Sequence, residues 1–483
     1  MNFIRSKRTS GRWLFQALFV VLGTAIAFTP LNVRSQTAAR RTGQANRPPA
    51  SAAELSQLSE AASLLQQGRP GDAESILRQV LLAAPRNPDA HNLLGIVLDQ
   101  GGQFKAAERE YREALRLNPA LISPLANLGI LLARTGRSEE AIRAFETVLK
   151  KAPDHPQATL NLGLQYMARS DYARAIPLLE RAVQLGGDNY QLRYNLGLAL
   201  YNLKRQDEAV SAFGSASAFS PNSAEPLYYL GLIYWARQQD ETAADLWDRA
   251  VHLRPNFPEA NFMLGEALRK HRRTAAAVEF YQRALEQDDS IFAHYTRLGG
   301  AYILLGQLEQ AFEVFRRAEK RFPKSPEAHY FVGIAARARA DYDLADRELR
   351  MSLTLQPDNV NALAQLGFIL LERDRTNEAE QILRRALTIN NKHFYANYDL
   401  GRLLVQTRRY QEAIPILRQA VTLKPGNPGV HYQLFITLSR LKSKEEADKE
   451  LAIFKQLDEA GKAQRQSGEE EDIEDNLPTP LSP

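Results

Sequence analysis

The pattern of hydrophobic positions recurs every 34 residues along the chain, which is the distance in sequence from Gly265 to Gly299. In the stretch from Phe292 to Ser325, Tyr295, Leu298 and Tyr302 fall on one helical face, and Phe315 falls on a second face further along. Two apolar faces separated by a short polar turn predict two amphipathic helices. A fixed interval of this length is typical of an array of helix–turn–helix repeats.

Small residues mark the same place in each repeat. A glycine recurs in the first expected helix and an alanine in the second. The glycines are Gly95, Gly129, Gly163, Gly197, Gly231, Gly265, Gly299, Gly333, Gly367 and Gly401, and the alanines recur at the same interval from Ala73 to Ala447. Glycine within a helix costs about 0.5–1 kcal/mol relative to alanine, so we expect these glycines to permit a close helix crossing beside the alanines.

Polar residues and prolines predict where the helices begin and end. Pairs such as Asn87–Pro88 and Ser325–Pro326 are typical of a helix start, and prolines such as Pro323 are typical of a position just beyond a helix end. The fourth residue after each alanine is large, as Phe315 is after Ala311. We expect these large residues to fill the space between the two helices of each repeat.

The pattern resembles the tetratricopeptide repeat family over residues 54–461, which divide into twelve blocks of equal length without insertions. The resemblance implies an all-α fold, a right-handed superhelical solenoid of paired antiparallel helices. It also implies a concave groove, lined by the first helix of each pair, that binds peptides or protein segments. Ala61 and Phe435 replace glycine in the first and last blocks, which suits end repeats that cap the array.

The first 53 residues contain eight basic residues and no acidic one. The apolar run Trp13–Phe28 and the Ala25–Ile26–Ala27 sequence predict a signal peptide or membrane anchor within residues 1–35. The protein is therefore expected to be exported, periplasmic or secreted. The alternative is an inner-membrane anchor that places the repeats in the periplasm. The absence of cysteine fits, because a core of this size needs no disulfide.

Two further segments are expected to be disordered. Residues 36–53 form a polar linker, and residues 467–483 form an acidic, proline-rich tail. The net charge of +5 comes mostly from the N-terminal segment, so the repeats themselves are nearly neutral. Proteins that bind nucleic acid concentrate positive charge on their folded part, and we therefore expect no nucleic-acid partner.

The sequence carries no recognisable catalytic, phosphate-binding or metal-binding motif. His91, His329 and His431 occupy the same place in three different repeats, so they cannot share one metal ion. We interpret them as packing or capping residues. The chain is accordingly expected not to be an enzyme and to use no cofactor or metal.

Asn127, Asn161 and Asn195 stand two residues before the glycine in three successive repeats. They resemble the asparagine ladder of the O-linked N-acetylglucosamine transferase repeats, which grips a peptide backbone through side-chain amides. An amide can donate and accept at once, so it can hold an extended chain of any sequence. The alternative is that they are polar residues on a hydrated groove.

Aromatic and charged residues complete the predicted groove. The aromatic candidates are Tyr194, Tyr228, Tyr229, Trp235, Phe262, Tyr330 and Tyr398, and the charged candidates are Arg269 and Arg297. We expect the aromatic residues to be partly exposed and to receive side chains of a partner. The charges either select an oppositely charged ligand or pair with one another.

These features predict an exported scaffold that binds an extended peptide or a helix of a protein partner in envelope assembly or secretion. Contact with a membrane is expected only through an uncleaved N-terminal segment. One alternative is the substrate-binding subunit of an enzyme complex whose catalyst is on another chain. A second alternative is a glycan-binding solenoid, since asparagine and stacked aromatic residues also suit sugars. The identity of the partner and the oligomeric state are left open.

Overall fold

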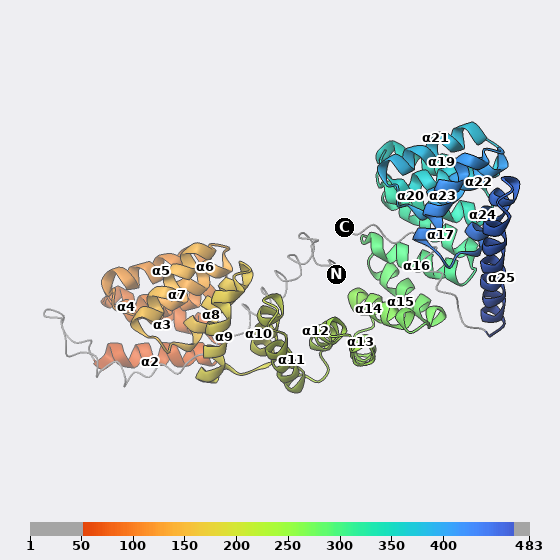
Figure 1. Ribbon diagram of the computed structural model, residues 1–483. Coiled ribbons are helices and arrows are strands. Elements are labelled where there is room, and N and C mark those ends of the chain that lie inside the picture. Colours follow the sequence, from red (N-terminus) through yellow and green to blue (C-terminus); the bar gives the residue numbers. More distant parts are fainter. Residues whose placement is uncertain (1–51, 468–483) are drawn as a thin grey trace. The chain divides into compact units, whose positions relative to one another are not determined.

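The computed structural model describes residues 52–467, with side chains through Lys462 (Figure 1). This range contains 24 α-helices and no strand, which confirms the all-α fold class. The chain divides into two compact units, one ending at Ile233 and the other beginning at Tyr234, and each is considered by itself. Within the range described, no helix combines the length and apolar character that crossing a membrane requires.

Several predicted segments fall outside this range. The predicted signal peptide or anchor (1–35), linker residues 36–51 and tail residues 468–483 lie outside the described residues. Ala52 and Ala53, expected in the linker, instead begin the first described helix, and Ser467, expected in the tail, ends the last one.

The helices alternate along the chain as first and second helices, two to each repeat. The first helices are α2 (Ala52–Gln66), α4 (Pro88–Gln100), α6 (Ser123–Arg134), α8 (Pro156–Ala168), α10 (Tyr190–Asn202), α12 (Ala224–Ala236), α14 (Pro258–Lys270), α16 (Phe292–Leu304), α18 (Pro326–Ala338), α20 (Val360–Glu372), α22 (Phe394–Gln406) and α24 (Pro428–Arg440). First helices of neighbouring repeats also touch, as α20 touches α22.

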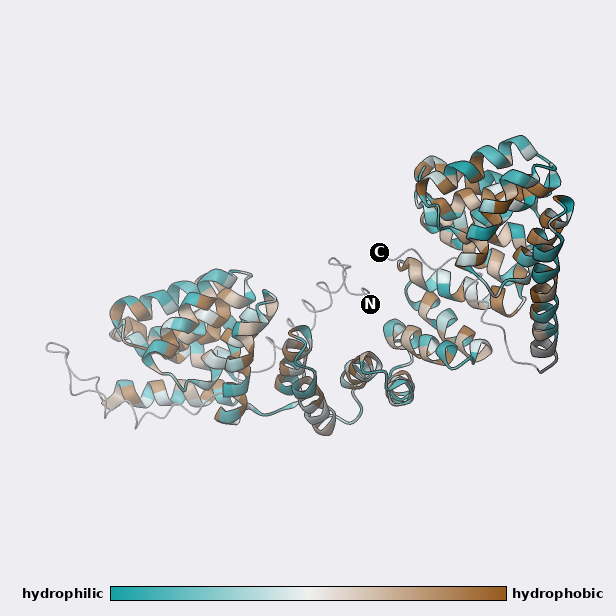
Figure 2. Cartoon of the chain, viewed as in Figure 1, coloured by the Kyte–Doolittle hydropathy of each residue, from teal (hydrophilic) through white to brown (hydrophobic). Residues whose placement is uncertain are grey.

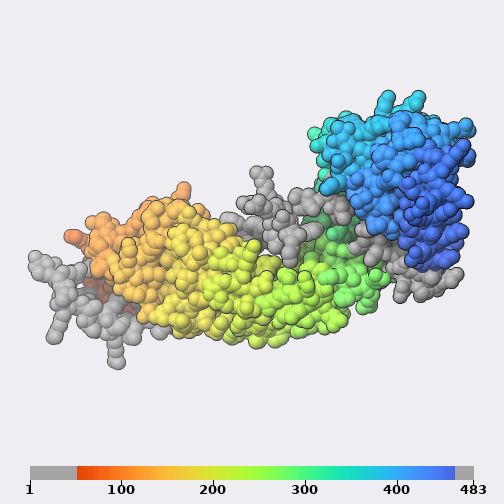
Figure 3. Space-filling model, in the orientation of Figure 1, coloured from red at the N-terminus to blue at the C-terminus, as the bar shows by residue number. Residues whose placement is uncertain are grey.

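The second helices are α3 (Pro70–Ala83), α5 (Phe104–Leu117), α7 (Ser138–Lys151), α9 (Tyr172–Ala182), α11 (Gln206–Phe219), α13 (Asp240–Leu253), α15 (Thr274–Gln287), α17 (Leu308–Arg321), α19 (Tyr342–Leu355), α21 (Thr376–Ile389), α23 (Tyr410–Leu423) and α25 (Lys444–Ser467). Second helices pack on the first helix of their own repeat and on that of the next, as α5 packs on α4 and α6 and α19 packs on α18 and α20. A short π-helical turn, η2 (Val183–Gly187), follows α9. In the space-filling view, the colours follow the order of the chain, from red to yellow-green in the first unit and from green to blue in the second (Figure 3).

A left-handed residue ends the first helix of every repeat. Positive φ angles between 55° and 78° recur once per repeat from Gly68 to Lys442. Glycine holds this place four times, at Gly68, Gly102, Gly136 and Gly306, and other residues hold it eight times. Since only glycine adopts this conformation without steric cost, the turn is imposed by the packing of the two helices rather than by the local sequence.

First-helix glycines from Gly95 to Gly197 and from Gly265 to Gly401 make room for a large side chain of the second helix. A Cβ built on Gly197 would lie 2.7 Å from Phe213, and one built on Gly95 would lie 2.6 Å from Tyr111. The glycine therefore faces the large residue, which stands four residues after the alanine, and at Gly333 the added Cβ would also lie 3.6 Å from the carbonyl oxygen of Ala345. The large residues from Leu77 to Leu417 are at most 1% exposed, as expected for residues that fill the core.

The alanine series packs as tightly. All alanines of this series are completely buried except the last, Ala447, which is 3% exposed. Coloured by hydropathy, the helices carry brown apolar residues and teal polar residues along the same helix, as amphipathic packing requires (Figure 2). A helix of the array thus buries one face against the other helix of its repeat and another face against a neighbouring repeat.

Polar side chains at one repeat position secure the loops between repeats. The Nε2 of His91 lies 3.0 Å from the carbonyl oxygen of Pro85, and His431 makes the same contact with Pro425 at 2.9 Å. The amide of Asn261 donates at this place to Pro255. These contacts agree with the interpretation of the histidines as capping residues.

The contact between glycine and the large residue gives a direct stability test. Gly197→Ala is expected to lower the free energy of unfolding by about 1–3 kcal/mol, because its methyl group would overlap Phe213. The matched control is Gly214→Ala on neighbouring α11, where an added Cβ meets no atom within 4 Å. The control should stabilise the protein by about 0.5–1 kcal/mol through helix propensity. Urea unfolding that shows equal stabilisation by both variants would contradict the packing account.

Candidate functional site

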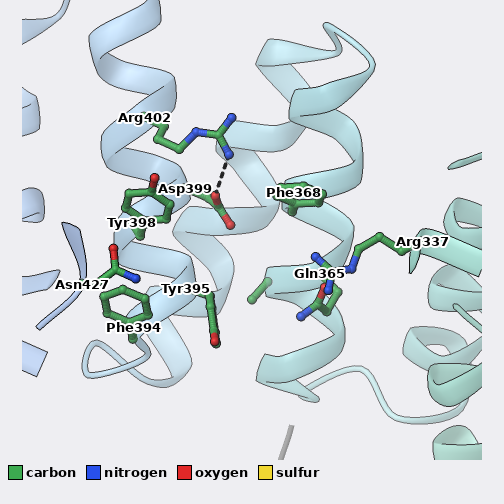
Figure 4. Close-up of a pocket in the computed structure, with 10 residues that line it drawn as sticks. Arg337, Gln365, Phe368, Phe394, Tyr395, Tyr398, Asp399, Arg402 and Asn427 are labelled. Atoms are coloured by element: carbon green, nitrogen blue, oxygen red, sulfur yellow. Dashed lines mark hydrogen bonds and ion pairs between the residues drawn. The ribbon is translucent and has the colours of Figure 1, made fainter. Parts of the chain in front are cut away.

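A pocket of about 250 Å³ lies on the first helices of the second unit. Its lining comes from α18, α20, α22 and the residue before α24. The lining residues are Arg337, Ala364, Gln365, Phe368, Phe394, Tyr395, Tyr398, Asp399, Arg402 and Asn427. Figure 4 shows Arg337 and Gln365 on one side of this pocket and Tyr395 and Tyr398 on the other. Below, it is called the first-helix pocket.

The repeat brings the polar lining residues together. Gln365 and Asp399 stand two residues before the glycines of their repeats, Phe368 and Arg402 stand one residue after, and Arg337 stands four residues after. Positions three residues apart lie on the same face of a helix. Successive first helices therefore align these side chains on one surface, where the identity of each is free to vary without disturbing the glycine contact.

Two buried polar atoms of the pocket have no hydrogen-bond partner. They are the Nε of Arg337, a donor, and the Oε1 of Gln365, an acceptor. Arg337 forms no ion pair with the residues described here, and its guanidinium lies over the ring of Phe368, 5.1 Å from the centroid. Buried polar atoms without partners cost about 1–3 kcal/mol each, so this pair marks a place suited to an incoming polar ligand.

Asp399 is the buried acid of the pocket. It is 4% exposed, and its Oδ1 lies 3.3 Å from the Nη1 of Arg402. Burial raises the pKa of Asp399 from 3.8 to about 7, although Arg402 opposes this shift. Arg402 is shared with Glu372, whose Oε1 accepts a hydrogen bond from it at 3.0 Å. Arg402 therefore pairs directly with two acids, whereas Arg337 pairs directly with none of the described residues and acts on Asp399 only through its charge, which also opposes the rise of that pKa.

The raised pKa of Asp399 predicts a pH-dependent stability. The folded protein holds a proton on this carboxyl between about pH 4 and 7 that the unfolded chain releases, so its contribution is lost as pH rises through that window. The unfolding free energy of the natural protein, relative to Asp399→Asn, is expected to fall from pH 4 to 7 and then level off. Asp358→Asn, an exposed acid of the same unit, is the control. Parallel pH profiles for the protein and Asp399→Asn would contradict this account.

The predicted asparagine ladder makes contacts within the chain. The Nδ2 of Asn127 donates to the Oδ1 of Asn92 at 3.1 Å, and the Nδ2 of Asn161 donates to the carbonyl of Gln157 at 2.7 Å. Asn127 and Asn161 are half-buried, whereas Asn195 is only 5% exposed. The burial of Asn195 is contrary to the expected open position.

The aromatic residues of the first unit form a continuous cluster. Tyr194 lies 6.1 Å from Tyr229 between ring centroids, and Tyr228 lies 5.3 Å from Tyr229. Tyr229 stacks on the buried Phe213 at 5.2 Å. All three tyrosines are half-buried, so the cluster joins the core at one edge and reaches the surface at the other.

The remaining aromatic candidates differ in exposure. Trp235, Phe262 and Tyr398 are half-buried, and Tyr398 lines the first-helix pocket. Tyr330 is 5% exposed and belongs to the core of the second unit, contrary to the expected partial exposure. Its ring lies 5.4 Å from that of Phe331 between centroids, and it belongs to the same buried cluster as Ile334 and Leu363.

The two predicted groove arginines meet at one acid. The Nε of Arg297 donates to the Oε1 of Glu266 at 2.8 Å, and the Nη2 of Arg269 lies 3.7 Å from the Oε2. The hydroxyl of Tyr281 donates to the same Glu266 Oε1. Of the two alternatives for these charges, the structure favours internal pairing.

Sequence reasoning missed most of the polar lining of the first-helix pocket. Arg337, Gln365, Asp399 and Arg402 were not among the expected groove residues, although Tyr398 was. The sequence did hold a clue to Gln365 and Asp399. Both stand two residues before the glycine of their repeat, which is the position that the asparagines of the predicted ladder occupy. The run of asparagines ends at Asn195, so residue identity alone does not reveal that the same position lines a pocket further along.

The paired helices and the aligned first-helix positions define a helical-repeat protein. Family models described as tetratricopeptide repeat match residues 58–122, 100–162 and 160–224. A model described as the C-terminal domain of cilia and flagella-associated protein 70 matches residues 236–472. The chain is a tetratricopeptide repeat protein, as the resemblance predicted.

Two curated relatives match short stretches. The type IV pilus assembly protein PilF of Pseudomonas aeruginosa is 33% identical over 85 residues, which are 18% of this chain and 34% of that protein. An uncharacterized protein, y4yS, of Sinorhizobium fredii is 40% identical over 57 residues, 12% of this chain and 31% of that protein. The chain thus spans about a third of the length of these relatives.

Solved structures of repeat proteins are also similar. YrrB, described as a tetratricopeptide repeat protein with an unusual peptide-binding site, is 22% identical, with a TM-score of 0.37 and coverage of 38% of this chain and 95% of YrrB. The anaphase-promoting complex structure Cut9–Hcn1 is 12% identical, with a TM-score of 0.41 and coverage of 78% and 95%. Both TM-scores are too low for either structure to support an argument about the candidate site.

Proposed function

We propose that this protein is an exported scaffold that binds an extended segment of a protein partner on its first helices. Tetratricopeptide repeat arrays are suited to protein–protein interaction, and the first-helix pocket is the anchoring point in this one. The observation that carries the proposal is the pair of buried, unpartnered atoms, the Nε of Arg337 and the Oε1 of Gln365.

A peptide supplies both groups that these atoms lack. A carboxylate, from an acidic side chain or from the end of a chain, accepts hydrogen bonds from a guanidinium. A backbone N–H donates to an amide oxygen such as that of Gln365. Phe368, Tyr395 and Tyr398 add apolar surface beside the polar atoms, as in the anchoring pockets of protein interfaces. The partner segment therefore carries an acidic group next to an apolar residue.

The proposed setting is assembly or secretion at a bacterial envelope. The basic and then apolar start of the chain supports export, and the short likeness to a type IV pilus assembly protein supports an envelope role. We further propose that the protein acts without catalysis of its own, since the pocket offers recognition groups and no nucleophile paired with a base.

Replacing the unpaired cation tests the proposal. The full chain would be tested on an array of synthetic peptides of random sequence. Each peptide would be made in two versions, one with its carboxylic acids and one in which those acids are replaced by the matching amides. We expect the protein to prefer the acidic versions. Arg337→Gln should weaken their binding by about 10- to 100-fold, the scale of a lost charge-assisted hydrogen bond.

The matched control removes an equal charge elsewhere. Arg418 on α23 is exposed and pairs with Glu446, so Arg418→Gln should leave peptide binding unchanged. Circular dichroism and melting of both variants would establish that each is folded. Equal binding of acidic and amide peptides, or equal binding by Arg337→Gln and Arg418→Gln, would contradict the proposed anchor.

A further inference from the structure

Three ligating side chains converge where two repeats of the second unit meet. Glu319 comes from the end of α17, His329 from the start of α18 and Glu348 from α19. The Nδ1 of His329 lies 2.8 Å from the Oε2 of Glu348 and 3.8 Å from the Oε1 of Glu319. One ligand atom from each residue lies within 4.8 Å of the others. This group is separate from the first-helix pocket and shares no residue with it.

The orientation of the His329 ring suits metal binding. Its Nε2 lies 3.2 Å from the carbonyl oxygen of Pro323, which only accepts, so this nitrogen donates to it. Its Nδ1 lies 2.8 Å from the Oε2 of Glu348 and donates to that carboxylate in the metal-free chain, and a bound ion would take the place of this proton between the same two atoms. Metal-binding histidines commonly donate their other ring N–H to a backbone carbonyl or carboxylate, which fixes the ring orientation.

Arg316 orients both carboxylates without using their ligating oxygens. Its Nη1 lies 2.5 Å from the Oε2 of Glu319 and 3.7 Å from the Oε1 of Glu348. The oxygens that approach His329 are the other two, the Oε1 of Glu319 and the Oε2 of Glu348. Arg316 therefore holds the outer oxygen of each carboxylate, while the inner oxygens face Nδ1.

Two other repeats hold the same histidine and glutamate without the third ligand. His91 with Glu110 and His431 with Glu450 repeat the Nδ1 contact, at 2.6 and 2.5 Å. Each histidine also contacts the loop carbonyl six residues earlier. The residue ten before the histidine, however, is Leu81 in one repeat and Val421 in the other, where the middle repeat has Glu319.

This difference shows what the common contact does and what Glu319 adds. The shared pair of histidine and glutamate is explained by fixing the loop between repeats. A second carboxylate on the same nitrogen is not needed for that purpose, since two repeats dispense with it. The three side chains are between 9% and 18% exposed, so they are sheltered but can be reached from solvent.

We propose that Glu319, His329 and Glu348 bind one Zn²⁺ ion, with a fourth position open to water. Zinc accepts imidazole nitrogen and carboxylate oxygen at about 2.0–2.2 Å in tetrahedral geometry, which places ligand atoms about 3.4 Å apart. The two measured separations from Nδ1 lie on either side of that value. The ion would clamp α17, α18 and α19 together and tie two successive repeats. The proposal replaces the expectation that the chain holds no metal site. That expectation was based on the spacing of the histidines and did not consider the acids that lie near His329.

Metal titration of the full, untagged chain tests the site. The chelator-treated protein would be titrated with zinc chloride by calorimetry, and with Co²⁺ while visible absorption is recorded. We expect one Zn²⁺ per chain and a Co²⁺ spectrum typical of a low-coordinate site. Glu319→Gln should weaken zinc binding by about ten-fold or more, because one of three ligands is lost.

The matched control uses the repeat that lacks the third ligand. Glu110→Gln removes the carboxylate partner of His91 and should leave the zinc stoichiometry and affinity unchanged. Zinc should raise the melting temperature of the natural protein and of Glu110→Gln, but much less that of Glu319→Gln. No zinc binding by the natural protein, or equal zinc binding by Glu319→Gln and the natural protein, would overturn the proposal.

Discussion

The contact between a first-helix glycine and a large second-helix side chain sets the geometry of every repeat that has one. At Gly197, for example, an added Cβ would lie 2.7 Å from the ring of Phe213, so the close approach depends on glycine. The large residue is fully buried, and the alanine four residues before it is buried as well. The positive φ of the intervening turn recurs in every described repeat, including the first and the last, which lack this glycine, and eight residues other than glycine adopt it. Stability is thereby built from contacts within a repeat and with its neighbours.

This packing leaves one set of positions free to carry function. Residues two before, one after and four after the glycine lie on the same face of the first helix, and their identities change from repeat to repeat. In α18, α20 and α22 they include Arg337, Gln365 and Asp399, which form a pocket with unsatisfied polar atoms. In α14 and α16 the equivalent residues neutralise one another around Glu266. The same helix positions therefore form a pocket with unpaired polar atoms in one part of the chain and a set of mutually paired charges in another.

The sequence was sufficient for the fold because its signals recur. Twelve aligned repeats predicted the helix pairs, the buried alanines and the buried large residues, since each signal appears many times. Exposure within one repeat was harder to predict, because it depends on which neighbour covers a side chain. Asn195 and Tyr330 were expected to be accessible, yet each is about 5% exposed. The zinc-binding proposal likewise depends on Glu319, which only the folded chain brings beside His329.

The central claim is that a protein partner lies on the first-helix face. The most direct measurement places a photo-crosslinking amino acid at Phe368 on α20, and separately at Arg418 on α23, in the full chain within its native cells. The account predicts a defined crosslinked partner at position 368, and no such product at position 418. Crosslinking at position 418 without crosslinking at position 368 would contradict it, because the partner would then bind the second helices.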